Sequence, residues 1–214
     1  MKHILLLALG LIGLSSAQAI EVSSSDLQKW NFKVFLDDKE IGFHKFEVKN
    51  ERDKQKISTN ASFNVKFFIF SAYKYEHDNL ERWRGRCLTQ IDSVTNDNGK
   101  ALKVVGRQTE DGFYVETHEM KKLYGPCVKT FAYWDYSILQ EKQLLNSQTG
   151  ELVDVDIEFI GRNPLTINGK TIRVRNYRLI AKNLQIDLWY SDTNRWLALE
   201  SLTESGRIVR YQSE

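Results

Sequence analysis

After residue 19 the chain contains three histidines, and their spacing bears on whether the protein could bind a metal ion. His44, His77 and His118 lie far apart, and none has another histidine two or four positions away. Because metal sites are recognised in a sequence from closely spaced ligands, the pattern predicts no metal site. We predict surface or rim positions for all three histidines.

His44 is the histidine best suited to a role at a site. The alternation of apolar residues slips by one around it, from Ile41 and Phe43 on one side to Phe46 and Val48 on the other. Such a slip predicts a β-bulge near His44, and bulges often turn a side chain toward a neighbouring site. His44 is therefore a candidate ligand-binding residue.

Three arginines surround a tryptophan at a predicted tight turn, namely Arg82, Arg84 and Arg86 around Trp83. Guanidinium groups pair well with phosphates and carboxylates, so the arginines are candidate anion contacts. Trp83 is a candidate ligand-binding residue. The alternative interpretation is a charged hairpin tip beside a packed tryptophan.

A second aromatic cluster, Tyr133-Trp134-Asp135-Tyr136, begins the one segment that breaks the strand pattern. This segment has good helix propensity and almost no β-branched residues, which predicts a short helix around residues 134–143. A helix across the open end of a curled sheet would bring these rings to the mouth of a cavity. Tyr133, Trp134 and Asp135 are therefore candidate ligand-binding residues, and simple closure of the core is the alternative.

Cys87 and Cys127 are the two cysteines of the chain. In an oxidising compartment two thiols most simply form a disulfide, and this one would stabilise the fold by about 4 kcal/mol on the chain-entropy estimate. A pair of free buried thiols is the alternative. A catalytic cysteine is disfavoured because no histidine lies nearby in the sequence.

The elements that must position these side chains are β-strands. From Ile57 to Ile69 every second residue is apolar or small and most residues between are polar, which predicts a long strand with one buried face. Phe67 on that face is a candidate ligand-binding residue. Similar alternations, separated by turn signals such as Asn98-Gly99, recur along the chain. We predict an all-β fold, an antiparallel meander of about 11–12 strands that forms a barrel or a strongly curved half-barrel.

The first 19 residues have the features of a secretory signal peptide. Lys2 and His3 precede an apolar run from Ile4 to Leu14, and Ala17-Gln18-Ala19 offers a cleavage site. The run is shorter than the ~20 residues that span a bilayer, which disfavours a membrane anchor. Cleavage would leave residues 20–214, which we predict to form a single β-barrel-like domain, periplasmic or secreted, with no integral membrane segment.

Charge and motifs argue against several partners. After removal of residues 1–19 the chain carries 29 basic and 28 acidic side chains, and this balance argues against nucleic acid. The sequence has no glycine-rich phosphate loop, no nucleophile elbow and no Cys-x-x-Cys motif. We therefore predict no cofactor.

Short motifs are spread over nearly the whole chain after residue 19. They are Trp30-x-Phe32, Leu36-Asp37-Asp38-x-x-Ile41-Gly42-x-His44-x-Phe46, Trp83-x-Gly85, Thr95-x-Asp97-Asn98-Gly99-Lys100, Tyr133-Trp134-Asp135, Leu144-Leu145-Asn146-x-x-Thr149-Gly150, Leu188-Trp189-Tyr190, Trp196-x-x-Leu199, Gly206-Arg207 and Tyr211. With these motifs the chain resembles a family of exported bacterial proteins known only as a domain of unknown function. The resemblance implies a periplasmic β protein and supplies no activity.

Three functions are compatible with these observations. The first is a soluble, non-enzymatic periplasmic protein that binds a lipid or acyl chain inside the curved sheet. The second is a scaffold or protein-interaction module of the cell envelope with a filled core. The third is a hydrolase or isomerase that acts on an envelope substrate through His44 or Asp135. The interior of the sheet, hollow or filled, distinguishes the first two.

Overall fold

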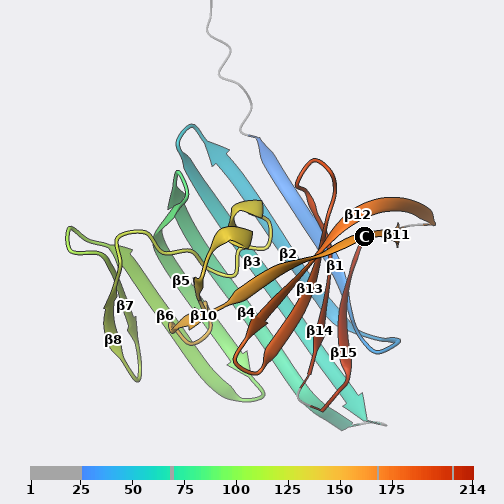
Figure 1. Ribbon diagram of the computed structural model, residues 1–214. Helices are drawn as coiled ribbons and strands as arrows, with labels where there is room; N and C mark the ends of the chain where they lie inside the picture. The colour runs from blue at the N-terminus through green and yellow to red at the C-terminus, as the bar shows by residue number, and fades with distance from the viewer. Residues whose placement is uncertain (1–25, 68–69, 168, 204) are drawn as a thin grey trace, which may run out of the picture.

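The structure, a computed structural model, describes residues 26–67, 70–167, 169–203 and 205–214 (Figure 1). The predicted signal peptide lies outside the described residues. Within them, no helix has the length and apolar character needed to cross a membrane.

Most of the described chain is β-strand, and η1 (Tyr136–Gln140) is the one helical element assigned in it. Thirteen strands form one antiparallel sheet in the order β11-β12-β13-β14-β15-β1-β2-β3-β4-β5-β6-β7-β8, and β9 and β10 form a second sheet. The bounds are β1 (Leu27–Leu36), β2 (Lys39–Glu51), β3 (Lys54–Phe67), β4 (Phe70–Arg84), β5 (Cys87–Asp97), β6 (Lys100–Gln108), β7 (Phe113–Thr117), β8 (Lys121–Tyr124), β9 (Gln143–Leu145), β10 (Leu152–Asp154), β11 (Asp156–Ile167), β12 (Lys170–Ala181), β13 (Leu184–Tyr190), β14 (Trp196–Leu202) and β15 (Ile208–Ser213). The predicted antiparallel meander is confirmed, with more strands than predicted.

The strand β3 shows how the sequence pattern produces the sheet. Ile57, Thr59 and Ala61 are buried, whereas Ser58 and Asn60 between them are exposed. Successive side chains of a strand point to opposite faces, so this alternation gives β3 one inner and one outer face. The last two residues of the predicted strand lie outside the described residues.

The two ends of the described chain pair with each other in the middle of the large sheet. β15 lies antiparallel to β1, with Phe32 opposite Ser213 and Leu36 opposite Val209. This pairing joins the N-terminal meander, β1 to β8, to the C-terminal meander, β11 to β15. Both meanders then curve around one interior (Figure 1).

The large sheet is strongly curved but does not close. Its edge strands, β8 and β11, are not paired with each other. Between them in the sequence lies the crossing segment, which we define as residues 125–155. It contacts both meanders, since Thr130 donates a hydrogen bond to Glu81 on β4 and Tyr190 on β13 donates one to the carbonyl of Tyr133. The fold is therefore the half-open form of the predicted barrel.

The predicted helix around residues 134–143 is reduced to one turn of 3-10 helix, η1 (Tyr136–Gln140). Asp135 caps η1, because its carboxylate accepts hydrogen bonds from the N–H and the hydroxyl of Ser137. Gln143 already belongs to β9, which pairs with β10. Helices shorter than about 12–15 residues depend on tertiary support, and here the strand pairing takes the last residue of the predicted helix.

The bulge predicted near His44 lies three residues earlier in the chain. The register between β1 and β2 shifts after Val34, which leaves Ile41 as the extra residue of β2. Gly42 has a φ of 151°, and a Cβ at this position would collide with the backbone carbonyl of Ser62 on β3, so the position favours glycine. His44 therefore faces inward through regular alternation and not through a bulge at His44 itself.

Two separate apolar clusters fill parts of the interior. The larger one packs both meanders against the crossing segment, through residues such as Trp83, Ile138 and Leu188. The smaller one consists of Val34, Leu36 and Ile41, with Phe63, Val65, Val209 and Tyr211 packed against them. It lies at the end of the sheet where β1 turns into β2.

The predicted disulfide between Cys87 and Cys127 is present, with the two Cα atoms 4.9 Å apart. It ties the first residue of β5 to the start of the crossing segment. Beside it, the N–H of Leu88 donates a hydrogen bond to the carbonyl of Val128, with a donor–acceptor distance of 2.9 Å. The crossing segment is thus held covalently against the N-terminal meander.

Candidate functional site: a cavity inside the half-open barrel

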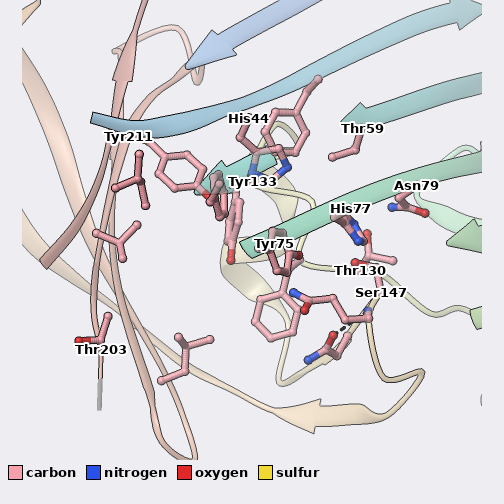
Figure 2. Close-up of a pocket in the computed structure, with 18 of the residues that line it drawn as sticks. His44, Thr59, Tyr75, His77, Asn79, Thr130, Tyr133, Ser147, Thr203 and Tyr211 are labelled. Atoms are coloured by element: carbon pink, nitrogen blue, oxygen red, sulfur yellow. Dashed lines mark hydrogen bonds between the residues drawn. The ribbon is translucent and has the colours of Figure 1, made fainter. Parts of the chain in front are cut away.

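A cavity of about 730 Å³ lies inside the barrel and is lined by residues of both apolar clusters (Figure 2). Small-molecule sites in proteins have volumes of roughly 300–1,000 Å³. The cavity wall comes from the inner faces of β1 to β4, from the crossing segment and from the C-terminal strands. It is therefore built by segments from the whole length of the chain.

The register of the strands explains why the sheet is hollow here. His44 of β2, Ala61 of β3 and His77 of β4 lie opposite one another in one row across the inner face. In the neighbouring row Thr59 of β3 lies opposite Asn79 of β4. The small side chains of β3 leave space between the larger side chains of β2 and β4.

Aromatic rings form much of the wall around this hollow. His44 stacks on Phe46 with ring centroids 4.1 Å apart, and Phe63 stacks on Tyr75 with centroids 5.1 Å apart. The ring of Tyr211 on β15 lies 5.5 Å from that of His44. Rings provide a large apolar contact area in a defined orientation.

His44 is held in the wall by Tyr211. Its Nδ1 lies 3.0 Å from the tyrosine hydroxyl, and which atom donates the hydrogen bond depends on the tautomer. The Nε2 atom is buried and has no hydrogen-bond partner among the described residues. One side of the ring faces the cavity, so the residue as a whole is only half-buried. Burial lowers the pKa of His44 to about 3, which makes it neutral at pH 7.

His77 is also an interior residue, with 5% of its surface exposed. Its Nδ1 lies 2.8 Å from the hydroxyl of Thr95, and burial lowers its pKa to about 4. His118 is exposed, as predicted. The predicted surface or rim positions are wrong for His44 and His77, because the registers of β2 and β4 direct both side chains to the inner face.

Glu81 is a carboxyl group at the cavity wall with only 3% of its surface exposed. It accepts hydrogen bonds from Asn79 Nδ2 and Trp83 Nε1, both at 2.8 Å, and from the hydroxyl of Thr130 at 3.2 Å. Burial raises the pKa of Glu81, and the three donors oppose that shift in part. No ion pair involves this carboxyl among the described residues, so neutral groups alone compensate its burial.

The crossing segment brings two of the predicted ligand-binding residues to the cavity. Tyr133 and Trp134 both line it, together with His44 on β2. Tyr133 is held by the hydrogen bond from the hydroxyl of Tyr190 to its carbonyl, at 2.8 Å. The ring of Trp134 packs edge-on against that of Trp83, with centroids 5.5 Å apart.

The other predicted ligand-binding residues do not join them. Trp83 is 1% exposed and lies behind the cavity wall, where it donates its hydrogen bond to Glu81. Asp135 is engaged in the cap of η1 and lines a separate, smaller cleft of about 450 Å³. The structure therefore does not bring Asp135 and His44 into one site. The side chain of Phe67 lies outside what the structure describes.

The three arginines predicted as anion contacts are exposed at the hairpin between β4 and β5. Arg84 lies 3.8 Å from the carboxylate of Asp53, and Arg86 lines the smaller cleft. Arg82 and Arg84 point outward and Trp83 points inward, because adjacent residues of a strand face opposite sides. The structure therefore separates the arginines from the indole that lies among them in the sequence.

Sequence reasoning missed the polar side of the cavity. Tyr75, His77, Asn79 and Glu81 follow one another on the inner face of β4, and all line the cavity. A signal for them existed in the sequence. These four residues alternate in step with Trp83 and therefore lie on the same face of the strand, and polar side chains on a buried face are unusual. Tyr211 carried no such signal, since it reaches the cavity only through the pairing of β15 with β1.

The fold and the cavity together define a class of protein: a half-open antiparallel β-barrel with an aromatic and partly polar cavity inside. Among the described residues no three His, Cys, Asp or Glu side chains are grouped so that they could hold a metal ion. A family model described as "Domain of unknown function (DUF6134)" matches residues 32–214, and the chain belongs to this family. The family resemblance predicted from the motifs is confirmed.

A solved structure supports the description of the fold. The chain is similar to the crystal structure of a β-barrel-like protein of domain of unknown function DUF1849 from Brucella abortus, with a TM-score of 0.64, at 8% sequence identity. The similarity covers 87% of this chain and 94% of that chain. At this identity the likeness concerns the fold alone. The curated proteins contain no match to the chain.

Proposed function

We propose that the protein binds an apolar small molecule, such as a lipid or an acyl chain, inside its half-open barrel. The observation that carries this proposal is the cavity of about 730 Å³, where aromatic rings meet the apolar side chains of Leu36, Ile41 and Val65. Moving apolar surface from water into such a wall stabilises a complex by roughly 25 cal/mol per Å². Protein interiors are otherwise close-packed, so a hollow of this size fits a ligand site better than a structural core.

A scaffold with a filled core explains the structure less well. In that case the two apolar clusters would meet in one core, whereas the cavity is lined by both of them. The exposed arginine–tryptophan patch that a scaffold could use is also missing, because Trp83 is buried.

The two residues that the sequence offers for catalysis, His44 and Asp135, give no support for chemistry on the ligand. A general base works best when its pKa lies near the operating pH. Burial lowers the pKa of His44 to about 3, which makes it a weak base at pH 7. Asp135, the other residue considered for catalysis, is occupied by the cap of η1.

We further propose that the protein works in the periplasm. Residues 1–19 have the pattern of a secretory signal peptide. The disulfide between Cys87 and Cys127 supports export, because such bonds persist in oxidising compartments and are rare in reducing ones.

Titration with N-phenyl-1-naphthylamine, an uncharged apolar dye that fluoresces when it leaves water, tests the proposed function. We expect saturable binding at one site, and native mass spectrometry of the protein purified from the periplasm should show a co-purified lipid. Absence of both signals would refute the proposal.

A variant with a filled cavity tests where the dye binds. Val65 lines the cavity on the inner face of β3, so Val65→Trp should weaken dye binding at least tenfold. Val94→Trp is the matched control, because Val94 on the outer face of β5 is 55% exposed. Circular dichroism establishes that both variants fold. Equal dye binding by the two variants would show that the dye does not bind in the cavity.

A further inference from the structure

The cavity has a polar wall at one end, which a purely apolar ligand would leave unused. His77, Asn79 and Glu81 of β4 form this wall with Thr59 and Thr130, and all five are buried. Asn79 donates a hydrogen bond through Nδ2 to Glu81, which fixes the orientation of its amide. The Oδ1 of Asn79 is buried and has no hydrogen-bond partner among the described residues. An acceptor is therefore left over at this wall.

Away from this wall, the lining along β3 is mainly apolar. Along the inner face of β3 the wall passes from Thr59 through Phe63 to Val65, a distance of about 20 Å at the rise of a strand. At the Val65 end it is lined by Leu36 and Val209. Figure 2 shows Thr203 on the far side of the cavity from Asn79 and Thr130. The cavity thus offers an apolar length that begins at a buried polar wall and ends at a rim where the exposed Ser205 and Arg207 also line it.

The polar wall contains no positive charge that could receive an anionic head group. Of the described residues that line the cavity, Arg207 is the one cation, and it is exposed and paired with Asp37 at 2.9 Å. Burial keeps His44 and His77 uncharged at pH 7 by lowering their pKa values to about 3 and about 4. Of the described residues that line the cavity, Glu81 is the one acid, and it is buried in the wall itself.

The phenol groups of the cavity are neutral as well. Burial raises the pKa values of Tyr75, Tyr133 and Tyr211, so all three remain protonated at pH 7. A carboxylate or phosphate placed at the polar wall would lose its hydration and find no opposite charge, which is strongly unfavourable. An uncharged head group with a hydrogen-bond donor would meet the free acceptor of Asn79.

We propose that the cavity selects amphiphiles with an uncharged, hydrogen-bonding head group, such as an amide, alcohol or glycerol ester, over amphiphiles with a carboxylate or phosphate head. This inference rests on the proposed function and names the class of ligand that the cavity takes. Thr59, Asn79 and Thr130 receive the head group, and the chain lies toward Val65 and Leu36.

The test compares oleamide with oleate, which share one acyl chain and differ in the charge of the head group. Each displaces N-phenyl-1-naphthylamine from the wild-type protein at pH 7.5, below the concentration at which it aggregates. We expect oleamide to bind at least tenfold more tightly. If the dye binds, then equal affinities for oleate and oleamide, or no displacement of the dye by either, would overturn the inference. Failure of the dye itself to bind refutes the proposed function instead.

A charge placed at the polar wall provides a second test. Thr59→Arg adds a cation to the inner face, and we expect it to reduce the preference for oleamide over oleate at least tenfold. Ser58→Arg is the matched control, because Ser58 is the neighbouring residue on the exposed face of the same strand. An equal preference in both variants would contradict the assignment of the head group to this wall. If Thr59→Arg does not fold, the wild-type comparison decides alone.

Discussion

The disulfide between Cys87 and Cys127 is expected to carry a large share of the stability of this fold. Its two cysteines are 40 positions apart, so it shortens a long loop of the unfolded chain. On the chain-entropy model, removal of such a cross-link lowers the free energy of unfolding by about 4 kcal/mol. For a protein of this size that corresponds to a melting temperature about 10 °C lower.

Replacement of both cysteines by serine tests this number with little change in packing. Cys127 is exposed and Cys87 is only half-buried, so the variant loses the cross-link and little buried surface. Urea denaturation of wild type and C87S/C127S measures the difference in the free energy of unfolding. Wild-type protein unfolded in the presence of a reductant is the control and should match the variant.

The location of the disulfide adds a local expectation. It holds the start of the crossing segment, whose residues Thr130, Tyr133 and Trp134 line the cavity. Amides of the crossing segment should therefore exchange with deuterium faster in C87S/C127S than in wild type, whereas amides of β3 should change much less. A loss of stability below about 1 kcal/mol would refute the chain-entropy reasoning. Unchanged exchange in the crossing segment would show that its noncovalent contacts suffice.

Two further predictions concern the histidines and a glycine. The pKa values of His44 and His77, about 3 and about 4, lie below the usual 6.5, so the unfolded chain takes up protons first as the pH falls. When the pH falls from 6.5 to 5, each of these two histidines should lower the free energy of unfolding by about 2 kcal/mol. Over this pH range, urea denaturation should therefore show a loss of stability in His77→Gln that is smaller than the wild-type loss by that amount. His118→Gln, at an exposed position, should behave as wild type; an unchanged pH dependence in His77→Gln would contradict the burial argument. In the same assay, Gly42→Ala should lower the free energy of unfolding by about 3 kcal/mol, because the added Cβ would strike the backbone of β3. Gly125→Ala is the control, since Gly125 has open space around it, and its free energy of unfolding should stay within about 0.5 kcal/mol of wild type. Similar losses in both variants would mean that β2 and β3 can move apart.

The fold class followed from patterns that are local in the sequence. The alternation in β3 from Ile57 onward predicted an inner and an outer face, and the structure has both. Asn98 and Gly99 adopt positive φ angles of 50° and 94° in the predicted hairpin between β5 and β6. Such features depend on a few neighbouring residues, which is why they can be read without a structure.

The candidate site was predicted in part. His44, Tyr133 and Trp134 line the cavity, although the bulge invoked for His44 lies elsewhere and the predicted helix is a single 3-10 turn. The polar residues of β4 were not predicted as a group. The sequence showed polar residues on the same face of the strand as Trp83. Whether that face packs against a filled core or lines a cavity depends on the side chains of the segments that lie opposite it.

By itself the sequence determined most of the strands, the inner and outer faces of strands such as β3, the hairpin turns and the pair of cysteines available for a disulfide. These follow from the backbone geometry of neighbouring residues and from a simple count of thiols. Only the tertiary structure decided that β15 pairs with β1, that the sheet stays open, and that the crossing segment leaves a cavity against β4. The reason is physical, because a cavity depends on the volumes of side chains that come into contact from distant parts of the sequence. Local periodicity carries no information about those contacts.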